Sequence, residues 1–350
     1  MKLRINPIKI GHKWIGEKKP CYVIAEIGSN FNDDIDLAKK LIKKAKDTGA
    51  DAAKFQSFQV DKILSKRGFE KKVSFQAKWK KPVWQVYKEA EFPLEWISKL
   101  SAFAKKCKID FLSTPYHIEA VDELIRCKVP AIKIGSGEIT NLEFLEHIAK
   151  TGKPILLATG ASTQKEVDVA VKTISRLNKK LILMQATTQY PSPIEDANLR
   201  VIDTFKNKYK INVGYSDHTP GFTGVMGSIA LGACTIEKHF TLDKSSSGPD
   251  HSHSLDPIEF AEMVKRIREM EIVLGSHKKK IEKSETQTNV IQRRGIWTVK
   301  KIEKGEKFTR SNIDVLRPNL GIPASQFRKI LKRKSKKNYS AFSPLKWQDF

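Results

Sequence analysis

Residues 22–58 read YVIAEIGSNFNDDIDLAKKLIKKAKDTGADAAKFQSF, and they contain one complete strand–helix–strand unit. Both ends of the stretch are short apolar runs, as in buried strands. Between them, residues 35–49 place apolar side chains three or four positions apart, which is the period of an amphipathic helix. The stretch therefore predicts two strands joined by a helix that covers one face of their sheet.

The same unit recurs along the chain. Residues 93–107 and 257–275 repeat the helical period. Eight short apolar runs are predicted as strands, at residues 22–28, 52–58, 109–115, 131–137, 154–160, 181–187, 211–217 and 234–240. Eight such units within about 250 residues are typical of a (β/α)8 TIM barrel. An open, doubly wound sheet fits less well, because no Gly-rich dinucleotide-binding turn follows the first strand.

The 350-residue chain changes character after residue 275. Residues 1–275 hold the predicted barrel, and residues 276–289, SHKKKIEKSETQTN, have the polar composition of a linker. Residues 290–350 combine short strand-like runs with a turn at Gly305, and they contain no long amphipathic pattern. We expect a barrel domain followed by a small, mostly β domain.

The composition is that of a globular protein. The net charge is +25, of which residues 277–350 contribute +14 and the remainder of the chain +11. Solvated lysine faces such as AKKLIKKAK (38–46) explain much of this charge without nucleic acid. The sequence has neither a signal-peptide pattern nor a long apolar run, and its four cysteines lack metal-finger spacing. We expect a cytoplasmic protein with reduced thiols that binds neither nucleic acid nor membrane.

A long segment separates the second predicted strand from the helix at residues 93–107. Residues 59–92 lack a clear strand period and carry Trp79, Trp84 and Tyr87. Loops of this length inside a compact domain are commonly functional. We expect a lid or binding loop over the barrel mouth.

Polar and reactive side chains collect where the predicted strands end, which is the face on which TIM barrels build active sites. One or two would be explained as hydrogen-bonded core residues, but the pattern repeats on nearly every strand. The set comprises Glu26, Lys54, Ser113, Thr114, Lys133, Ser136, Glu138, Thr159, Gln185, Tyr190, Asp217, His218, Glu237, Lys238 and His239.

His218 and His239 end consecutive predicted strands, so they should be neighbours across the barrel mouth. Two imidazoles and a carboxylate suit a borderline divalent metal such as Mn, Fe, Co or Zn, with positions left open for substrate. The alternative for each histidine is a hydrogen-bonded core role. The candidate carboxylates are Glu26 and Asp250. Asp250 lies in the loop SGPDHSHSLDP, which also supplies His251 and His253.

Lys54 and Lys133 end the second and fourth predicted strands, where an unpaired ammonium in an apolar wall is costly. Something anionic should therefore meet them. Thr114, Ser136 and Thr159 add hydroxyl donors nearby, which together predict a cradle for a phosphate and a carboxylate. The alternative is a Schiff-base lysine, as in lyase barrels, but two lysines beside a metal favour the phosphate interpretation.

In order and spacing, the motifs resemble those of the N-acetylneuraminate (sialic acid) synthase family, over roughly residues 20–350. The matching stretches are IAEIGSN, KFQSF, FLSTP, KIGSGEITNL, YPSP, GYSDHT, IEKHFTLD and GPDHSHSLDP. The resemblance implies a transferase that condenses phosphoenolpyruvate with open-chain N-acetylmannosamine and water. The products would be a nine-carbon 2-keto sugar acid and phosphate, formed with C–O cleavage.

The resemblance also implies roles for single residues. His218 and His239 would hold a divalent metal, usually Mn²⁺, that polarises the aldehyde. Glu26 and Asp250 would lie beside the metal and the sugar hydroxyls, as candidates for proton transfer and for placing water. The residues expected to contact phosphoenolpyruvate or line the site are Lys54, Thr114, Lys133, Ser136, Thr159, Thr188 and Tyr190.

The end of the chain resembles the SAF (antifreeze-like) domain that follows the barrel in that family. There the SAF domain of one subunit covers the barrel of its partner, and an arginine of an RP motif reaches the N-acetyl group of the sugar. Arg317 stands at that position, in VLRP (315–318). The resemblance thus implies a domain-swapped homodimer with a shared active site.

The chain departs from the family pattern at Phe31, Ala158 and Thr188, where histidine, serine and asparagine are usual. The stretch ILKRKSKK (330–337) also lacks the usual Leu-Gly-Lys. An N,N′-diacetyllegionaminate or pseudaminate synthase therefore remains an alternative, because pocket contacts to the sugar decide between these products. A Schiff-base lyase, and a barrel scaffold whose basic tail binds polyanions, are the alternatives from other classes.

Overall fold

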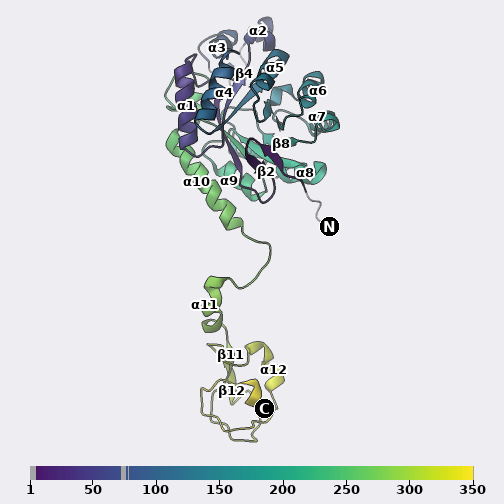
Figure 1. The fold of residues 1–350 in the computed structure, drawn as a ribbon. Coiled ribbons are helices and arrows are strands. Elements are labelled where there is room, and N and C mark those ends of the chain that lie inside the picture. Colours follow the sequence, from purple (N-terminus) through teal and green to yellow (C-terminus); the bar gives the residue numbers. More distant parts are fainter. Residues whose placement is uncertain (1–4, 72–75, 78, 350) are drawn as a thin grey trace. The chain divides into compact units, whose positions relative to one another are not determined.

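The computed structural model describes residues 5–71, 76–77 and 79–349, and it divides into two compact units, Met1–Gly275 and Ser276–Phe350 (Figure 1). The strands of the main sheet are β3 (Tyr22–Gly28), β4 (Ala52–Ser57), β5 (Asp110–Pro115), β6 (Ile132–Ile134), β7 (Ile155–Ala158), β8 (Leu181–Ala186), β9 (Asn212–Asp217) and β10 (Thr235–His239). They pair in parallel in the order β5-β4-β3-β10-β9-β8-β7-β6. The two end strands also approach to within 8 Å between Cα atoms, so the sheet curls into a barrel. The predicted (β/α)8 fold is confirmed.

Helices follow the strands and pack on the outside of the barrel. They are α1 (Ile35–Asp47), α4 (Trp96–Lys106), α5 (Ile118–Arg126), α6 (Leu142–Lys150), α7 (Gln164–Leu177), α8 (Val201–Tyr209), α9 (Thr223–Ala230) and α10 (Pro257–Leu274). Asp34 caps α1 by accepting hydrogen bonds from two backbone amides of its first turn. A reciprocal capping box of Asp256 and Glu259, with proline in the first turn, begins α10. Local side-chain chemistry therefore decides where these helices begin.

Strand side chains alternate between the barrel interior and the helix-facing side. Apolar residues near the amino ends of the strands, among them Tyr22, Ala52 and Leu112, form one cluster with Ile10 and Ile15. The two isoleucines come from an N-terminal hairpin, β1 (Ile8–Ile10) and β2 (Lys13–Ile15). This hairpin plugs the amino ends of the strands, so polar inward residues concentrate at the carboxyl ends.

The segment at residues 59–92 forms short helices, α2 (Val60–Ile63), the 3-10 helix η1 (Arg67–Phe69) and α3 (Val83–Glu89). The part of it that the structure describes contains no strand, in agreement with the absence of a strand period. Residues 72–75 and 78 lie outside the described part.

The second unit has its own apolar core. Two short antiparallel strands, β11 (Gly295–Thr298) and β12 (Ile313–Leu316), pair with each other. The core also contains Phe308, Ile330 and Leu345. Helices η6 (Lys283–Glu285), α11 (Thr286–Ile291), η7 (Ala324–Gln326), α12 (Phe327–Ile330) and η8 (Trp347–Asp349) complete the unit, and the first of them lies within the predicted linker.

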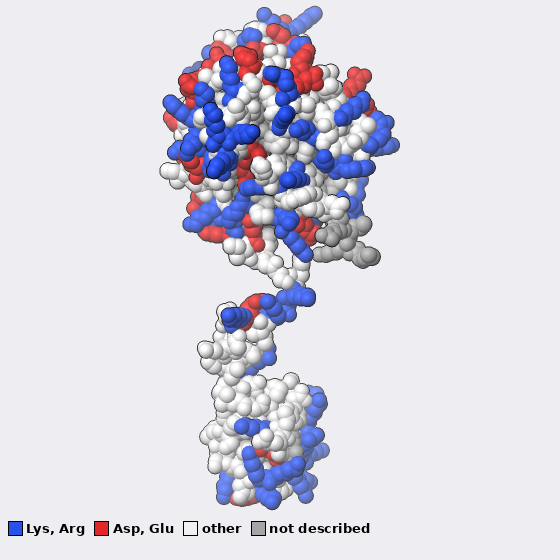
Figure 2. All heavy atoms as spheres, viewed as in Figure 1, with Lys and Arg blue, Asp and Glu red and all other residues white. Residues whose placement is uncertain are grey.

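Basic side chains are distributed over the visible face of the first unit with acidic ones between them (Figure 2). This pattern is typical of solvated helix faces. None of the four cysteines is in a disulfide. Among the described residues, no helix combines the length and the apolar character needed to cross a membrane.

Candidate active site

A cavity of about 550 Å³ opens at the carboxyl ends of the barrel strands. The strands bring their last inward-facing side chains to its wall, at the end where TIM-barrel enzymes place their active sites. Ten of the residues expected from the sequence line it, namely Glu26, Lys54, Thr114, Lys133, Ser136, Thr188, Tyr190, His218, His239 and Asp250.

Thr159 is not among the residues that line this cavity, and its expected role as a substrate-binding hydroxyl stays a prediction. The preceding residue, Ala158, lines the cavity instead, because successive strand side chains point to opposite faces. The Thr159 hydroxyl donates a 3.0 Å hydrogen bond to the carbonyl oxygen of Met184 in β8. Other polar residues of the strand-end set that are absent from the cavity lining are Ser113, Gln185, Asp217 and Lys238.

Four charged side chains meet in the buried part of the cavity. Lys54 Nζ lies 2.7 Å from Glu26 Oε2 and 3.7 Å from Glu237 Oε1. Lys133 Nζ lies 3.6 Å from the same oxygen of Glu237. All four residues are 5% exposed or less. The anionic partner that the lysines require is therefore supplied by the chain itself, and Glu237 bridges the two lysines.

Burial and pairing set the pKa of each of these groups differently. Burial raises the pKa of Glu26, although Lys54 opposes the shift. Burial also dominates at Lys133, where it lowers the pKa. At Lys54 burial is outweighed by Glu237 and Glu26, which raise the pKa, and at Glu237 it is outweighed by both lysines, which lower it. Glu237 thus stays ionised, and Glu26 is the carboxyl of the pair that takes up a proton more readily.

Hydroxyl groups extend the polar wall beside the lysines. Lys54 Nζ donates a 3.0 Å hydrogen bond to Thr114 Oγ1, and the amide of Gly160 donates one of 3.0 Å to Ser136 Oγ. A Cβ atom at Gly160 would lie 2.1 Å from Thr188 Oγ1, so a side chain at this position would force Thr188 to shift. Two ammonium groups with hydroxyl donors around them suit the oxygens of a phosphate and a carboxylate.

Three histidines and Tyr190 form one cluster on another part of the cavity wall. His218 follows β9, His239 ends β10, and His253 belongs to the 3-10 helix η5 (His251–His253) in the loop after β10. Ring centroids are 5.6 Å apart for His218 and His239 and 4.8 Å apart for His239 and His253. The ring of Tyr190 lies between 4.4 and 5.9 Å from all three.

Burial keeps these imidazoles neutral. It lowers the pKa of His218 to about 4, lowers the pKa of His239 well below its usual value, and lowers that of His253 as well. His218 Nδ1 lies 2.7 Å from the carbonyl oxygen of Thr187, so this nitrogen donates and leaves the Nε2 lone pair available. Within the described residues, His239 Nδ1 and His253 Nε2 are buried without hydrogen-bond partners. Neutral rings with available lone pairs are suited to bind a metal.

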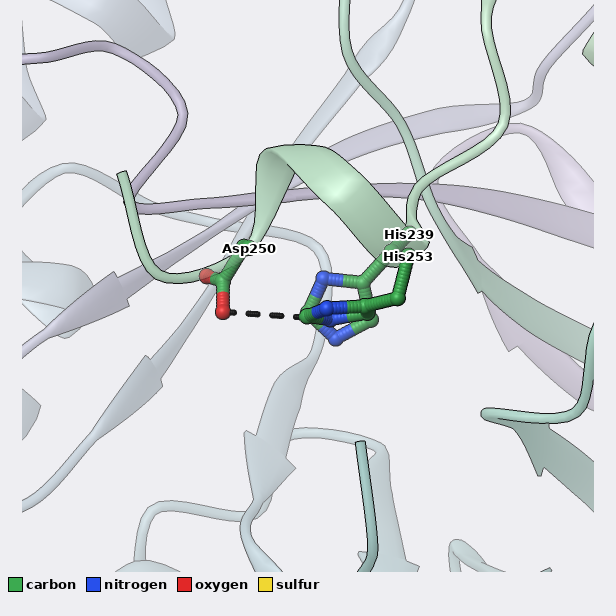
Figure 3. Close-up of side chains that lie close together, drawn as sticks. All are labelled: His239, Asp250 and His253. Atoms are coloured by element: carbon green, nitrogen blue, oxygen red, sulfur yellow. Dashed lines mark ion pairs between the residues drawn. The ribbon is translucent and has the colours of Figure 1, made fainter. Parts of the chain in front are cut away.

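Asp250 is the carboxylate that lies beside the imidazoles. In the described part of the chain, His239, Asp250 and His253 offer ligand atoms that all lie within 4.8 Å of one another (Figure 3). The backbone amide and the hydroxyl of Ser29 donate to Asp250 Oδ2, over 3.2 and 3.0 Å, and orient this side chain. Glu26, the other carboxylate considered from the sequence, is paired with a lysine instead.

The sequence placed Glu237 among the reactive strand-end residues and His253 in the loop beside the candidate metal ligands, but it assigned neither of them a specific role. Strand alternation offers a signal for Glu237, because it lies two positions before His239 and so faces the same side. His253 lies three positions after Asp250, which is one turn of a 3-10 helix. Recognising that turn required the three-dimensional structure.

The segment at residues 59–92 contributes to the cavity, as its expected role as a binding loop requires. Trp79 and Tyr87 line it, and their rings contact each other with centroids 5.8 Å apart. Phe58 packs against Tyr87 at 5.8 Å. Trp84 is not among the lining residues and instead lies beneath the ammonium group of Lys66, 4.9 Å from it.

The departures from the family pattern lie in different places. Ala158 and Thr188 line the cavity. Phe31 does not, because it is buried in an aromatic group with Phe92 and Trp96, at centroid distances of 5.6 and 5.8 Å. Arg317 lies in the second unit, directly after β12, and is exposed. Its expected contact with a sugar stays a prediction.

The mouth of this TIM barrel combines buried lysines, hydroxyl donors and an imidazole–carboxylate cluster, at the end of the barrel where TIM-barrel enzymes place their active sites. The NeuB family model matches residues 41–279, more than half of the chain, and the chain belongs to the NeuB family.

Relatives of this family cover nearly the same length. The chain is 41% identical to an N,N′-diacetyllegionaminic acid synthase of Campylobacter jejuni, over 92% of this chain and 97% of the relative. It is 35% identical to the N-acetylneuraminate-9-phosphate synthase of Mus musculus, over 89% of this chain and 86% of the relative. A crystal structure of an N-acetylneuraminic acid synthetase from Leptospira borgpetersenii matches 81% of this chain and 95% of its own with a TM-score of 0.74 and 30% identity. These relatives are sugar-acid synthases.

Proposed function

We propose that the chain condenses phosphoenolpyruvate with an open-chain N-acetylated hexosamine and water, giving a nine-carbon 2-keto sugar acid and phosphate. The observation that carries the proposal is the presence, in one cavity, of the buried group of Lys54, Lys133 and Glu237 and of the imidazole–carboxylate cluster. The first suits a small dianionic substrate, and the second suits the polarisation of an aldehyde.

Phosphoenolpyruvate would occupy the lysine side of the cavity. Lys54 and Lys133 supply charge, and Thr114, Ser136 and Thr188 supply hydroxyl groups. Glu237 holds the two ammonium groups in place before the anion arrives. Prepositioned donors avoid the cost of rearrangement during the reaction.

On the imidazole side we propose a divalent metal, most simply Mn²⁺, as the resemblance of the motifs to the sialic acid synthase family implies. The residues fit this group, because buried, neutral rings with unpartnered nitrogens stand beside a carboxylate. His218, His239 and Asp250 would hold it. When bound, such an ion supplies Lewis-acid polarisation of the aldehyde oxygen.

The bond changes in the proposed reaction balance as follows. C3 of phosphoenolpyruvate forms a bond to the aldehyde carbon, whose oxygen gains a proton. A water oxygen adds at C2, the bond from C2 to the bridging oxygen breaks, and C2 becomes the keto carbon. Of the two water protons, one balances the proton gained by the aldehyde oxygen and the other leaves with the released phosphate. Glu26 is the group proposed for proton transfer, since burial raises its pKa toward the working range of a general acid or base.

N-acetylmannosamine is the sugar that we propose first, on the basis of the motifs and of the sialic acid synthases among the relatives. The 41% identity to an N,N′-diacetyllegionaminic acid synthase supports a diacetylated hexosamine equally well. Loop residues such as Trp79 and Tyr87 line the cavity and would contact the sugar. We further propose that the second unit is a SAF-type domain whose Arg317 completes the site of a partner subunit in a homodimer.

A substrate panel tests this function. The full chain, stripped with a chelator, would be assayed for phosphate release with phosphoenolpyruvate and each candidate hexosamine, with and without added Mn²⁺. We expect release that depends on both an aldehyde and the metal, with ¹⁸O from the bridging position recovered in phosphate. Release with none of the sugars would refute the synthase. Trapping of pyruvate on Lys133 by borohydride, with activity that survives chelation, would establish the Schiff-base alternative.

A further inference from the structure

We infer that His253 is a third imidazole ligand of the metal site, in addition to His218 and His239, and that it lies together with His239 and Asp250 around one ion. The inference rests on the proposed function and adds a ligand to its metal site. It does not depend on which sugar is used. It assigns to the loop after β10 two ligands, from positions three apart, rather than the carboxylate alone.

The geometry brings these three side chains together from two elements. His239 ends β10, whereas Asp250 precedes η5 and His253 closes it. Their ligand atoms lie within 4.8 Å of one another, and the rings of His239 and His253 face into the same space (Figure 3). Ligand atoms at about 2.0–2.2 Å from one ion lie at most about 4.4 Å apart, so side-chain shifts of a few tenths of an ångström would bring all three to bonding distance.

The environment of His253 offers no structural partner for its Nε2. This nitrogen is buried and has no hydrogen-bond partner in the described part of the chain. Asp250 Oδ1 lies 3.9 Å away, which is too far for a hydrogen bond. Burying a polar nitrogen without a partner costs free energy, so an unmet acceptor of this kind calls for an explanation.

His251, two positions earlier, shows what a structural histidine looks like in the same loop. Its Nδ1 lies 2.7 Å from the hydroxyl of Thr241, and its Nε2 lies 3.2 Å from Oδ1 of Asn32. Both nitrogens are therefore engaged within the protein. His251 therefore fastens the loop, whereas His253, in the same 3-10 turn, is the one suited to be a ligand.

Orientation of the carboxylate strengthens the assignment. Ser29 donates two hydrogen bonds to Asp250 Oδ2, and these leave Oδ1 on the side of His253. Outer partners of this kind orient metal ligands and are part of a metal site. Two or more imidazoles with one carboxylate favour borderline ions such as Mn²⁺, Fe²⁺, Co²⁺ and Zn²⁺ over Mg²⁺ and Ca²⁺, which prefer oxygen ligands.

The test is a Co²⁺ titration of the chelator-treated full chain, followed by calorimetry and by the visible absorption of the bound ion. His253→Ala should weaken Co²⁺ binding by about 100-fold or more, since loss of a direct ligand should exceed the 10- to 100-fold effect of losing an outer partner. It should also change the absorption spectrum, which reports on the atoms bound to the ion.

Two further variants separate ligation from packing. His253→Phe keeps an aromatic ring against Tyr190 but has no lone pair, so it should bind Co²⁺ as weakly as His253→Ala does. His147→Ala is the matched control, because this half-buried histidine pairs with Asp122 on the barrel exterior. It should leave the affinity and the spectrum unchanged. Far-ultraviolet circular dichroism would verify that each variant is folded.

Wild-type affinity and spectrum in folded His253→Ala would overturn the inference, and so would restored affinity in His253→Phe. Failure of the wild-type chain to bind Co²⁺ would overturn it as well. Phosphate release measured on the same preparations distinguishes this result from failure of the proposed function. A wild-type chain that binds Co²⁺ through His253 but condenses no sugar would refute the function and leave the ligand assignment standing.

Discussion

Lys54 Nζ and Glu26 Oε2 lie 2.7 Å apart, with side chains that are 2% and 1% exposed. A pair buried this deeply adds little net stability while it is intact, because removal of two charges from water offsets their attraction. Loss of one partner, in contrast, leaves the other charge buried and uncompensated.

We therefore expect Lys54→Met to lower the free energy of unfolding by about 3–5 kcal/mol, measured by urea denaturation. The double variant with Glu26→Gln should be less destabilised than the sum of the two single variants, since the uncompensated charge is gone. Lys62→Met removes an exposed pair with Glu119 at 3.1 Å and should cost no more than about 1 kcal/mol. Equal losses in Lys54→Met and Lys62→Met would contradict a buried charge network.

Two threonines test the alternation of side chains along the strands. Thr114 lines the cavity and accepts a hydrogen bond from Lys54, whereas Thr159 donates to a strand carbonyl. Thr114→Val should weaken binding of phosphoenolpyruvate by about 10-fold, as expected for loss of a hydrogen bond to a charged group. Thr159→Val should leave that affinity within about twofold and cost about 1 kcal/mol of stability. Calorimetry of both variants would show the opposite pattern if Thr159 were the phosphate ligand.

Arg317 tests the proposed role of the second unit. If its guanidinium reaches the N-acetyl group, Arg317→Ala should raise the KM for the aldehyde by about 10-fold or more and leave the KM for phosphoenolpyruvate nearly unchanged. Arg328→Ala alters another exposed arginine of the same unit and serves as the control. Equal aldehyde kinetics in both variants would remove the arginine from the site.

A pH dependence of stability should arise at the other end of the barrel. The hydroxyl of Tyr22 donates a 2.7 Å hydrogen bond to Asp110 Oδ2, but burial dominates and raises the pKa of Asp110 above its usual 3.8. At pH values between the unfolded pKa of Asp110 and its raised folded pKa, the folded chain retains a proton that the unfolded chain releases. The contribution of Asp110 to stability is thus present below the unfolded pKa and is lost as the pH rises through the folded pKa.

Asp110→Asn should remove this loss, measured from the free energy of unfolding between about pH 3 and pH 7. Asp36→Asn is a control of opposite sign. The pairing of Asp36 with Lys39 lowers the pKa of this exposed carboxyl, so its small contribution is present above the unfolded pKa and is lost as the pH falls. An unchanged pH profile in Asp110→Asn would contradict the raised pKa.

Much of the fold was accessible from local patterns. The run at residues 22–28 is strand β3, and the amphipathic stretch at 35–49 contains helix α1, because a short continuous apolar run and an apolar period of 3.6 residues lead to different elements. Thr159 was predicted to bind substrate because it is a polar residue at a strand end, but it is not among the residues that line the cavity. Counting from its neighbour Ala158 would have placed the hydroxyl on the helix-facing side.

The candidate site was accessible only in part. Lys54 and Lys133 stood out because an ammonium in a barrel wall needs an anion, but the sequence did not reveal that Glu237 meets both. The sequence also left two candidates for the carboxylate beside the histidines, namely Glu26 in the first predicted strand and Asp250 in the loop after the last one. Ser29 and Asp250, which are 221 positions apart, meet only because the barrel brings its first and last strands side by side.

The sequence by itself determined the order of strands and helices, the face on which reactive groups collect and the kinds of group present there. These features depend on periodicity and residue type, which act over a few positions along the chain. The tertiary structure alone decided the partners, namely Glu26 with Lys54, Glu237 with both lysines, and Asp250 with His239 and His253. Pairing depends on strand register and on the path of a loop, and both are set by packing of the whole barrel.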